Sequence, residues 1–183
     1  DGGYRRLNGF TPFGDTKPNS SETNLGMAVY ADGIIVCSGT DIFFSVDGED
    51  AWLQINKASV ASGGDNYTAF TGRSAAARTS QGRCTFAIYE GTSDYGEIVI
   101  CDGVNEPFLF QMTGTSGLES RTFFAKEITV SGTTGPAFGI IHDKHLVVAG
   151  ASTAKNTVYY SGTNDIDSFS STGSGSIVLS DAV

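Results

Sequence analysis

The hydrophobic positions of this chain come in short runs, separated by glycine-rich and acidic turns. The clearest case is residues 27–37, where two apolar runs flank Ala31-Asp32-Gly33. Asp-Gly between two apolar runs is a strong hairpin signal, because the tightest hairpin turns need positive φ at their central residues. Further runs follow at 42–46 and 52–55. This part of the sequence therefore predicts a four-stranded antiparallel meander.

Two later parts of the chain repeat this order of short apolar strands and turns. The middle repeat has expected strands at 85–89, 97–101 and 107–111. The last repeat has expected strands at 138–141, 145–149 and 157–161, with a turn at His142-Asp143-Lys144. Glycine, asparagine and aspartate in the intervening turns fit this interpretation, since they tolerate turn conformations that other residues resist.

Two stretches indicate how the repeats correspond. IFFSVDGEDAW at 42–52 and VYYSGTNDIDSFS at 158–170 each combine an aromatic strand, an acidic turn and a further aromatic residue. We interpret them as equivalent hairpins between third and fourth strands, which places Trp52 and Phe169 in fourth strands. In this interpretation the final segment GSIVLSDAV, 175–183, opens a further repeat.

The central strands GIIVC, EIVIC and HLVVAG show no polar alternation, which is typical of strands that are buried on both faces. The sequence therefore predicts an all-β fold of repeated antiparallel β-meanders, at about 26–60, 82–115 and 136–183. We expect them to form part of a β-propeller, and a β-sandwich is the alternative. Known propellers use about four to eight blades, so three meanders cannot close a ring. We expect the chain, which opens DGGYRRL, to be part of a longer polypeptide; a trimer with three sheets per subunit is less economical.

Charge and composition narrow the classes of function. The 183 residues include 20 acidic and 11 basic side chains, a formal net charge of -9, which argues against binding of nucleic-acid phosphates. No apolar run approaches the about 20 residues that cross a bilayer, so no membrane span is predicted. Cys37, Cys84 and Cys101 are an odd number of cysteines, and we expect them to be buried thiols. Free thiols suit a reducing compartment, or one where disulfides are unnecessary.

Candidate chemistry is sparse, and we predict no catalytic residue, no cofactor, no metal and no enzymatic activity. His142 and His145 form an H-x-x-H pair, but it straddles a turn and lacks an evident third ligand. The acidic turns at 47–50, 102–106 and 163–167 lack the spacing of a calcium-binding loop. Their Asp and Asn side chains are expected to cap the turns.

Residues 1–25 differ from the rest, because they show no strand periodicity and are rich in turn formers. We predict an extended N-terminal arm that lies across a neighbouring subunit or domain. Its candidate subunit contacts are Tyr4, Arg5, Arg6, Phe10 and Phe13. Further aromatic residues in or near expected loops are candidates for stacking on sugars or on a partner, although most should fill the spaces between sheets; they are Trp52, Tyr67, Tyr95 and Phe169.

The arm GGYRRLNGFTPFG, followed by hairpins that end in YYSGTNDIDSF, resembles structural proteins of tailed bacteriophages. The resemblance is to tail hub, nozzle and tail-completion proteins, several of which contain a β-propeller. It covers the first fourteen or so residues and the three hairpins. The first repeat departs from the hairpin pattern, with Val46 where the last has Gly162, and Trp52 in place of Phe169.

This resemblance implies a non-catalytic, ring-forming component of the virion tail that is made in the host cytoplasm. Its implied partners are other copies of itself and other virion proteins. An acidic channel wall would let DNA pass without specific binding, because it repels phosphates. Two alternatives stay open: a glycan-binding or glycan-hydrolysing β-propeller, and a secreted adhesin-like β-repeat protein with calcium in its acidic turns.

Overall fold

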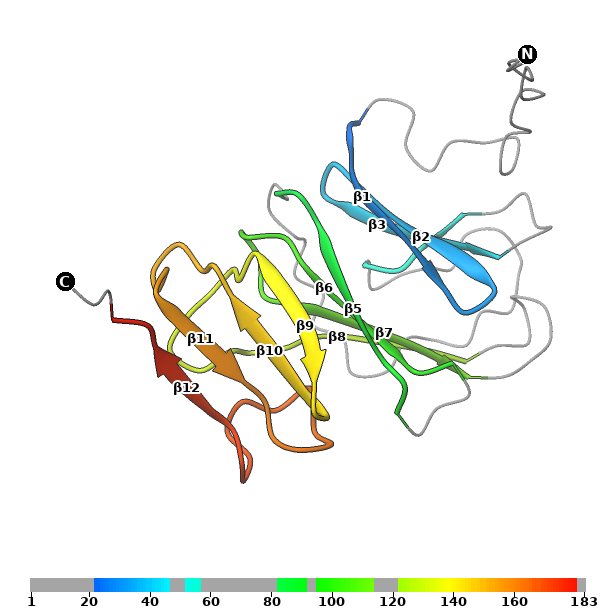
Figure 1. The fold of residues 1–183 in the computed structure, drawn as a ribbon. Helices are drawn as coiled ribbons and strands as arrows, with labels where there is room; N and C mark the ends of the chain where they lie inside the picture. The colour runs from blue at the N-terminus through cyan, green and yellow to red at the C-terminus, as the bar shows by residue number, and fades with distance from the viewer. Residues whose placement is uncertain (1–21, 47–51, 57–81, 92–94, 114–121, 181–183) are drawn as a thin grey trace, which may run out of the picture.

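The computed structural model describes residues 22–46, 52–56, 82–91, 95–113 and 122–180 (Figure 1). These residues form three four-stranded antiparallel sheets, and they contain no helix. In each sheet the order of the strands in space is their order in the sequence. The predicted all-β fold of repeated antiparallel meanders is therefore confirmed.

Each sheet is built from one continuous stretch of chain. Sheet 1 contains β1 (Asn24–Tyr30), β2 (Gly33–Ser38), β3 (Asp41–Val46) and β4 (Leu53–Gln54). Sheet 2 contains β5 (Thr85–Tyr89), β6 (Glu97–Cys101), β7 (Phe108–Thr113) and β8 (Thr122–Glu127). Sheet 3 contains β9 (Phe138–His142), β10 (His145–Ala149), β11 (Thr157–Tyr160) and β12 (Gly175–Val178).

The first hairpin of sheet 3 shows why these residues turn where they do. His142 and His145 pair across the hairpin, so Asp143 and Lys144 form its two-residue loop. Both loop residues have positive φ, 46° at Asp143 and 67° at Lys144. Two positive φ values give a turn whose twist matches that of the flanking strands. The turn predicted here from the sequence is confirmed.

The prediction that residues 175–183 open a further repeat is wrong. Gly175–Val178 is β12, the fourth strand of sheet 3, and Ile177 pairs with Val158 of β11. Phe169 does not lie in a strand; it belongs to the connection between β11 and β12, and its ring is buried in the core between sheets 2 and 3. Burying a large aromatic ring stabilises the fold wherever the chain can deliver it, in a loop or in a strand.

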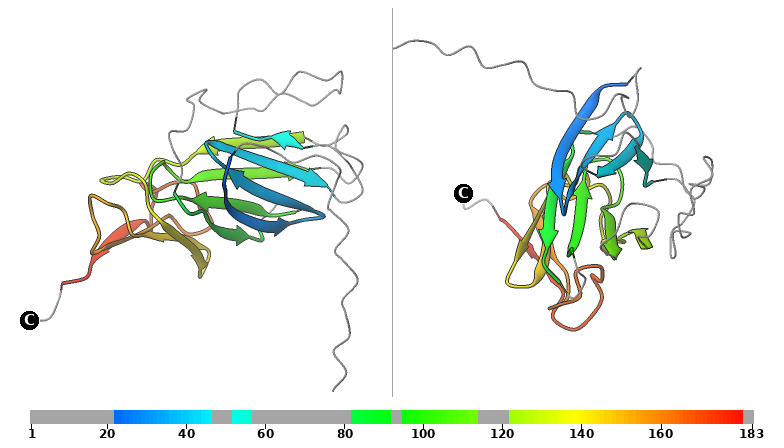
Figure 2. Two further views of the ribbon diagram at one scale, coloured as in Figure 1. Left: turned by 90° about the horizontal axis from the view of Figure 1, so that it is seen from above. Right: turned by 90° about the vertical axis from the view of Figure 1, so that its right-hand side faces the viewer.

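The three sheets lie beside one another in chain order, with sheet 2 between sheets 1 and 3 (Figures 1 and 2). We call the face that points toward the next sheet in the chain the forward face, and the opposite face the rear face. On β6, Ile98 and Ile100 belong to the core with sheet 1, whereas Val99 and Cys101 belong to the core with sheet 3. Both faces of sheet 2 are therefore covered, which explains the lack of polar alternation in this strand.

Two hydrophobic cores hold the stack together. Core 1 lies between sheets 1 and 2 and is rich in aromatic rings, among them Tyr30, Phe44, Phe108, Phe110 and Phe123. Core 2 lies between sheets 2 and 3 and is mainly aliphatic, with Val99, Leu109, Ile128, Val130, Leu146 and Val148. Cys37, Cys84 and Cys101 are buried in these cores as thiols, which confirms that part of the sequence analysis.

Candidate functional site

The last residue of each first strand marks one end of the contact between neighbouring sheets. Tyr30 ends β1 and donates a hydrogen bond from its hydroxyl to the carbonyl oxygen of Gly96 in sheet 2, at 2.7 Å. Tyr89 ends β5, and its hydroxyl lies 3.3 Å from Oδ1 of Asn164, in the connection that follows β11 of sheet 3. A tyrosine at this position thus links each sheet to the next one.

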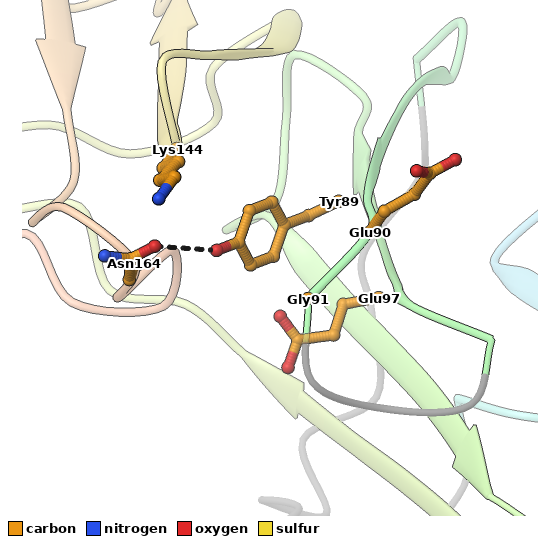
Figure 3. Close-up of a pocket in the computed structure, with 6 residues that line it drawn as sticks. All are labelled: Tyr89, Glu90, Gly91, Glu97, Lys144 and Asn164. Carbon is orange, nitrogen blue, oxygen red and sulfur yellow. Dashed lines mark hydrogen bonds between the residues drawn. The ribbon is translucent and has the colours of Figure 1, made fainter.

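A pocket of about 380 Å³ opens beside Tyr89, between sheets 2 and 3. It is lined by Tyr89, Glu90, Gly91, Glu97, Lys144 and Asn164. In Figure 3 the ring of Tyr89 lies between the carboxylate of Glu97 on one side and the side chains of Lys144 and Asn164 on the other, and the Glu90 carboxylate points away. The pocket therefore offers an aromatic ring, an acid, an amide and an ammonium group within one small space.

The positions of these side chains follow from the hairpins. Glu97 is the first residue of β6 and pairs directly with Tyr89. Lys144 and Asn164 both have left-handed backbones, with φ of 67° and 57°, and the Asn164 N–H donates to the Lys144 carbonyl at 3.0 Å. Two turns of sheet 3 are thus joined to each other on the side of the pocket opposite Glu97.

Two carboxylates near the pocket have pKa values shifted in opposite directions. Burial raises the pKa of Glu97, and the nearby charge of Asp167 raises it further, while Lys126 opposes the shift. Burial would also raise the pKa of Asp167, but hydrogen bonds with Lys126 and Asp165 outweigh it and lower the pKa overall. Lys126 and Asp167 form an ion pair between β8 and the connection after β11. This end of the contact between sheets 2 and 3 is consequently polar and charged, unlike core 1.

The histidine pair has a structural explanation. Nδ1 of His145 lies 2.5 Å from the carbonyl oxygen of Ser161, and Nε2 lies 3.2 Å from the hydroxyl of Thr163. Both ring nitrogens therefore contact the connection that leaves β11, and the ring also packs edge-on against Tyr160. Among the residues that the structure describes, no group of three or more His, Cys, Asp or Glu side chains could hold a metal ion.

The acidic turn at 102–106 is organised by its own hydrogen bonds. Oδ1 of Asp102 accepts the backbone N–H groups of Val104 at 2.9 Å and of Asn105 at 2.8 Å, and Oδ2 accepts the Asn105 side-chain amide at 2.6 Å. Asp102 is buried, so these donors replace water around its carboxylate. Turn capping, as predicted, is the role of this aspartate. The acidic turn at 47–50 lies outside the described residues.

The candidate subunit contacts Tyr4, Arg5, Arg6, Phe10 and Phe13 lie outside the described residues, as does Tyr67. Of the other loop aromatics, Tyr95 packs against core 1 and Trp52 is half-buried.

The pocket was not predicted from the sequence, because its residues come from strand ends and turns of two different sheets. The available signal was the tyrosine at the end of the first strand, which occurs at both Tyr30 and Tyr89.

No protein-family model, curated protein sequence or solved structure matches this chain. Within the described residues, no helix has the length and apolar character required to span a membrane.

Proposed function

We propose that this protein is a non-catalytic structural component of a bacteriophage virion, a tail protein that forms part of a β-propeller-like ring. The observation that carries the proposal is the exposure of apolar side chains on the outer faces of sheets 1 and 3. Sheet 2 packs against a neighbour on both faces, and its most exposed large apolar strand residue, Ile88, is 45% exposed. Sheets 1 and 3 each carry more exposed large apolar side chains on the face that points away from sheet 2. Exposed apolar patches on a folded protein are typical of interaction surfaces, which suits a component of an assembly.

The way in which the sheets touch supports a ring. Their backbones approach one another most closely at the first strands: β1 lies near β5, and both β5 and β6 lie near β9. The approach is close, because a Cβ atom on Gly139 of β9 would lie 3.0 Å from the Sγ atom of Cys101 in sheet 2. Sheets that meet along their first strands are arranged around a common axis, as the blades of a propeller are.

The negative net charge of the chain supports a position next to passing DNA without binding of the DNA. A formal net charge of -9 repels phosphates, so an acidic inner wall would let DNA pass without specific binding. A positive electrostatic potential along the ring's inner surface would contradict this part of the proposal.

The test of the virion role is to find the protein in purified phage particles. We expect mass spectrometry of such particles to detect it together with tail proteins, and antibody labelling in electron micrographs to place it at the tail. Because synthesis precedes assembly, the protein should also be present in the host cytoplasm before particles form. Its absence from purified particles would contradict the proposal.

The pocket beside Tyr89 favours a second candidate function, glycan binding. An aromatic ring next to an acid and an amide is a common arrangement for recognising a sugar, since the ring stacks on the sugar face and the polar groups bind its hydroxyls. In a glycan-array screen, Tyr89→Ala should remove binding. Phe138→Ala, which truncates an exposed aromatic residue outside the pocket, should leave it intact. No binding by the unaltered protein would exclude this second function.

A further inference from the structure

The forward face of sheet 3 is equivalent to the forward faces of sheets 1 and 2, each of which packs against the next sheet of the same chain. Two residues before the end of the first strand, this face carries Ala28 in sheet 1, Ala87 in sheet 2 and Ile140 in sheet 3. Ala28 packs against core 1 and Ala87 is buried in core 2. Ile140, by contrast, is 62% exposed and its neighbour Phe138 is 61% exposed. At this position sheet 3 therefore presents a larger apolar side chain than either equivalent, and no sheet of the described residues covers it.

The rear face of sheet 1 also carries exposed apolar side chains, at the other end of the stack. Met27 and Val29 of β1 occupy the positions that Gly139 and Ile141 occupy in β9. Ile141 packs against core 2, whereas Met27 is 69% exposed and Val29 is 70% exposed. Val36 and Phe43, on the central strands of the same face, are already buried, so β1 is the part of this face that is open.

We propose that the forward face of sheet 3 binds the rear face of sheet 1 in a second copy of this chain. The inference rests on the ring-forming role proposed above and names the partner and the surfaces. In this arrangement β9 of one copy lies against β1 of the other, as β5 lies against β9 and β1 against β5 within one chain. The three sheets of the described residues, taken from two copies, give a ring of six sheets, within the about four to eight blades of known propellers.

Both open surfaces have the chemistry that such a contact needs. Each is apolar along its first strand, and sheet faces that bury apolar side chains against each other form stable cores. His142 ends β9 and faces forward, at the position where Tyr30 and Tyr89 reach the next sheet. An imidazole there is exposed and can bond a polar group of the partner. A head-to-tail contact of this kind closes when its rotation brings the last copy back to the first.

The first test is the mass of the purified chain in solution, measured by light scattering or analytical ultracentrifugation over a range of concentrations. We expect the mass of two chains. Ile140→Lys and Val29→Lys should each weaken dimerisation by at least about tenfold, since either places an ammonium group in an apolar contact. Val104→Lys is the matched control, because Val104 is an exposed apolar residue in the turn after β6, on neither face. Dimerisation of this control should be unchanged.

Disulfide trapping tests which surfaces meet. Within the chain, a Cβ atom on Gly139 would lie 3.9 Å from the Cβ atom of Ala87, and the equivalent pair between copies is Met27 and Ile140. A mixture of Ile140→Cys and Met27→Cys chains should therefore form a disulfide between the two variants, whereas neither variant alone should form one. A bond between two Ile140→Cys chains would show sheet 3 against sheet 3 and overturn the proposal, as would a monomer or an open polymer of the unaltered chain. The virion role fails separately: a trapped dimer that is absent from phage particles refutes that role and leaves this contact standing.

Discussion

The two cores of this protein solve one packing problem with different side chains. Core 1 packs aromatic rings against one another: Phe110 lies 5.8 Å from Tyr30, 5.6 Å from Phe44 and 5.9 Å from Phe123, measured between ring centroids. Core 2 has mainly aliphatic side chains and one ring from a loop, Phe169, and a polar pocket opens at its edge. The meander topology is the same on both sides.

The three sheets therefore repeat the same backbone topology, but they do not repeat the same side chains. A sheet that presents apolar groups on both faces can stack on neighbours of varied composition, because cores tolerate different apolar residues when their volume is filled. The difference also shows which of the two cores has a pocket at its edge. Core 1 is closed by aromatic rings and a buried hydrogen bond, whereas a polar pocket opens to solvent at the edge of core 2.

The largest expected effect separates the two cores within one strand. On β7, Phe110 is fully buried in core 1 and Leu109 is buried in core 2. Phe110→Ala should lower the free energy of unfolding by about 3–5 kcal/mol, and Leu109→Ala by about 2–5 kcal/mol, through lost burial and the cavities left behind. Urea-induced unfolding measures both changes.

Hydrogen exchange should then show which contact each variant weakens. Phe110→Ala should raise exchange mainly in sheet 1, and Leu109→Ala mainly in sheet 3, because each truncation loosens one core. If both variants accelerate exchange equally in all three sheets, the cores are not separable and the comparison breaks down.

An intermediate effect compares the two equivalent tyrosines. Tyr30→Phe removes the donor to the Gly96 carbonyl inside core 1 and should cost about 1–3 kcal/mol of stability, because a buried acceptor loses its partner. Tyr89→Phe removes an exposed contact with Asn164 and should change stability by less than about 0.5 kcal/mol. Thermal or urea unfolding measures the loss of stability in each variant. Equal losses in Tyr30→Phe and Tyr89→Phe would contradict the expected difference between the two tyrosines.

The same tyrosine gives a spectroscopic check. Burial raises the pKa of Tyr30 to about 12, against a hydrogen bond from the Met112 backbone that lowers it. In an absorbance titration of the folded protein, one phenol should therefore ionise well above the ordinary value of 10, and Tyr30→Phe should remove that late step.

The smallest expected effects concern the two carboxylates beside core 2, and they have opposite signs. The pKa of Glu97 is raised above 4.5, so its contribution to stability is present at low pH and is lost as pH rises through the raised value. Glu97→Gln should therefore be slightly more stable than the unaltered protein at pH 7, with the difference closing as pH falls toward 4.5.

The pKa of Asp167 is lowered below 3.8, so its contribution is present above that value and is lost as pH falls through the lowered one. Asp167→Asn should be less stable at pH 7 and should approach the unaltered protein only below pH 3.8. Unfolding midpoints measured from pH 7 downward test both variants, and stability differences of the same sign would contradict the opposite directions of the two pKa shifts.

The sequence predicted the meanders well where local chemistry determines the structure. The turn at Asp143 and Lys144 and the buried strand Glu97–Cys101 were both recognisable, because turn residues and apolar runs carry their own signals. β12 was assigned to the wrong repeat, since the pairing of Ile177 with Val158 depends on how the long connection between them folds. β8 was missed altogether, although its sequence TFFAKE contains two aromatic residues.

The pocket could not be predicted for a related reason. Glu97 reaches Tyr89 through the pairing of β5 with β6, but Asn164 is far away in the sequence, and only the packing of sheet 3 on sheet 2 brings it to the same tyrosine. Phe169 shows the same limit, because an aromatic residue that fills a core from a loop has the composition of a strand residue. Local sequence specifies the sheets here, while contacts between sheets specify the site.

Because each sheet is made from one continuous stretch, the protein is suited to fold in steps as it is synthesised. All pairs among the described strands join neighbours in the chain, so one sheet can form before the residues of the next have left the ribosome. The forward face of sheet 1 would then stay exposed to solvent until sheet 2 is synthesised, and that of sheet 2 until sheet 3 is synthesised. The order of the strands thus also determines the order of folding during synthesis, in which each new sheet covers the apolar face of the sheet before it.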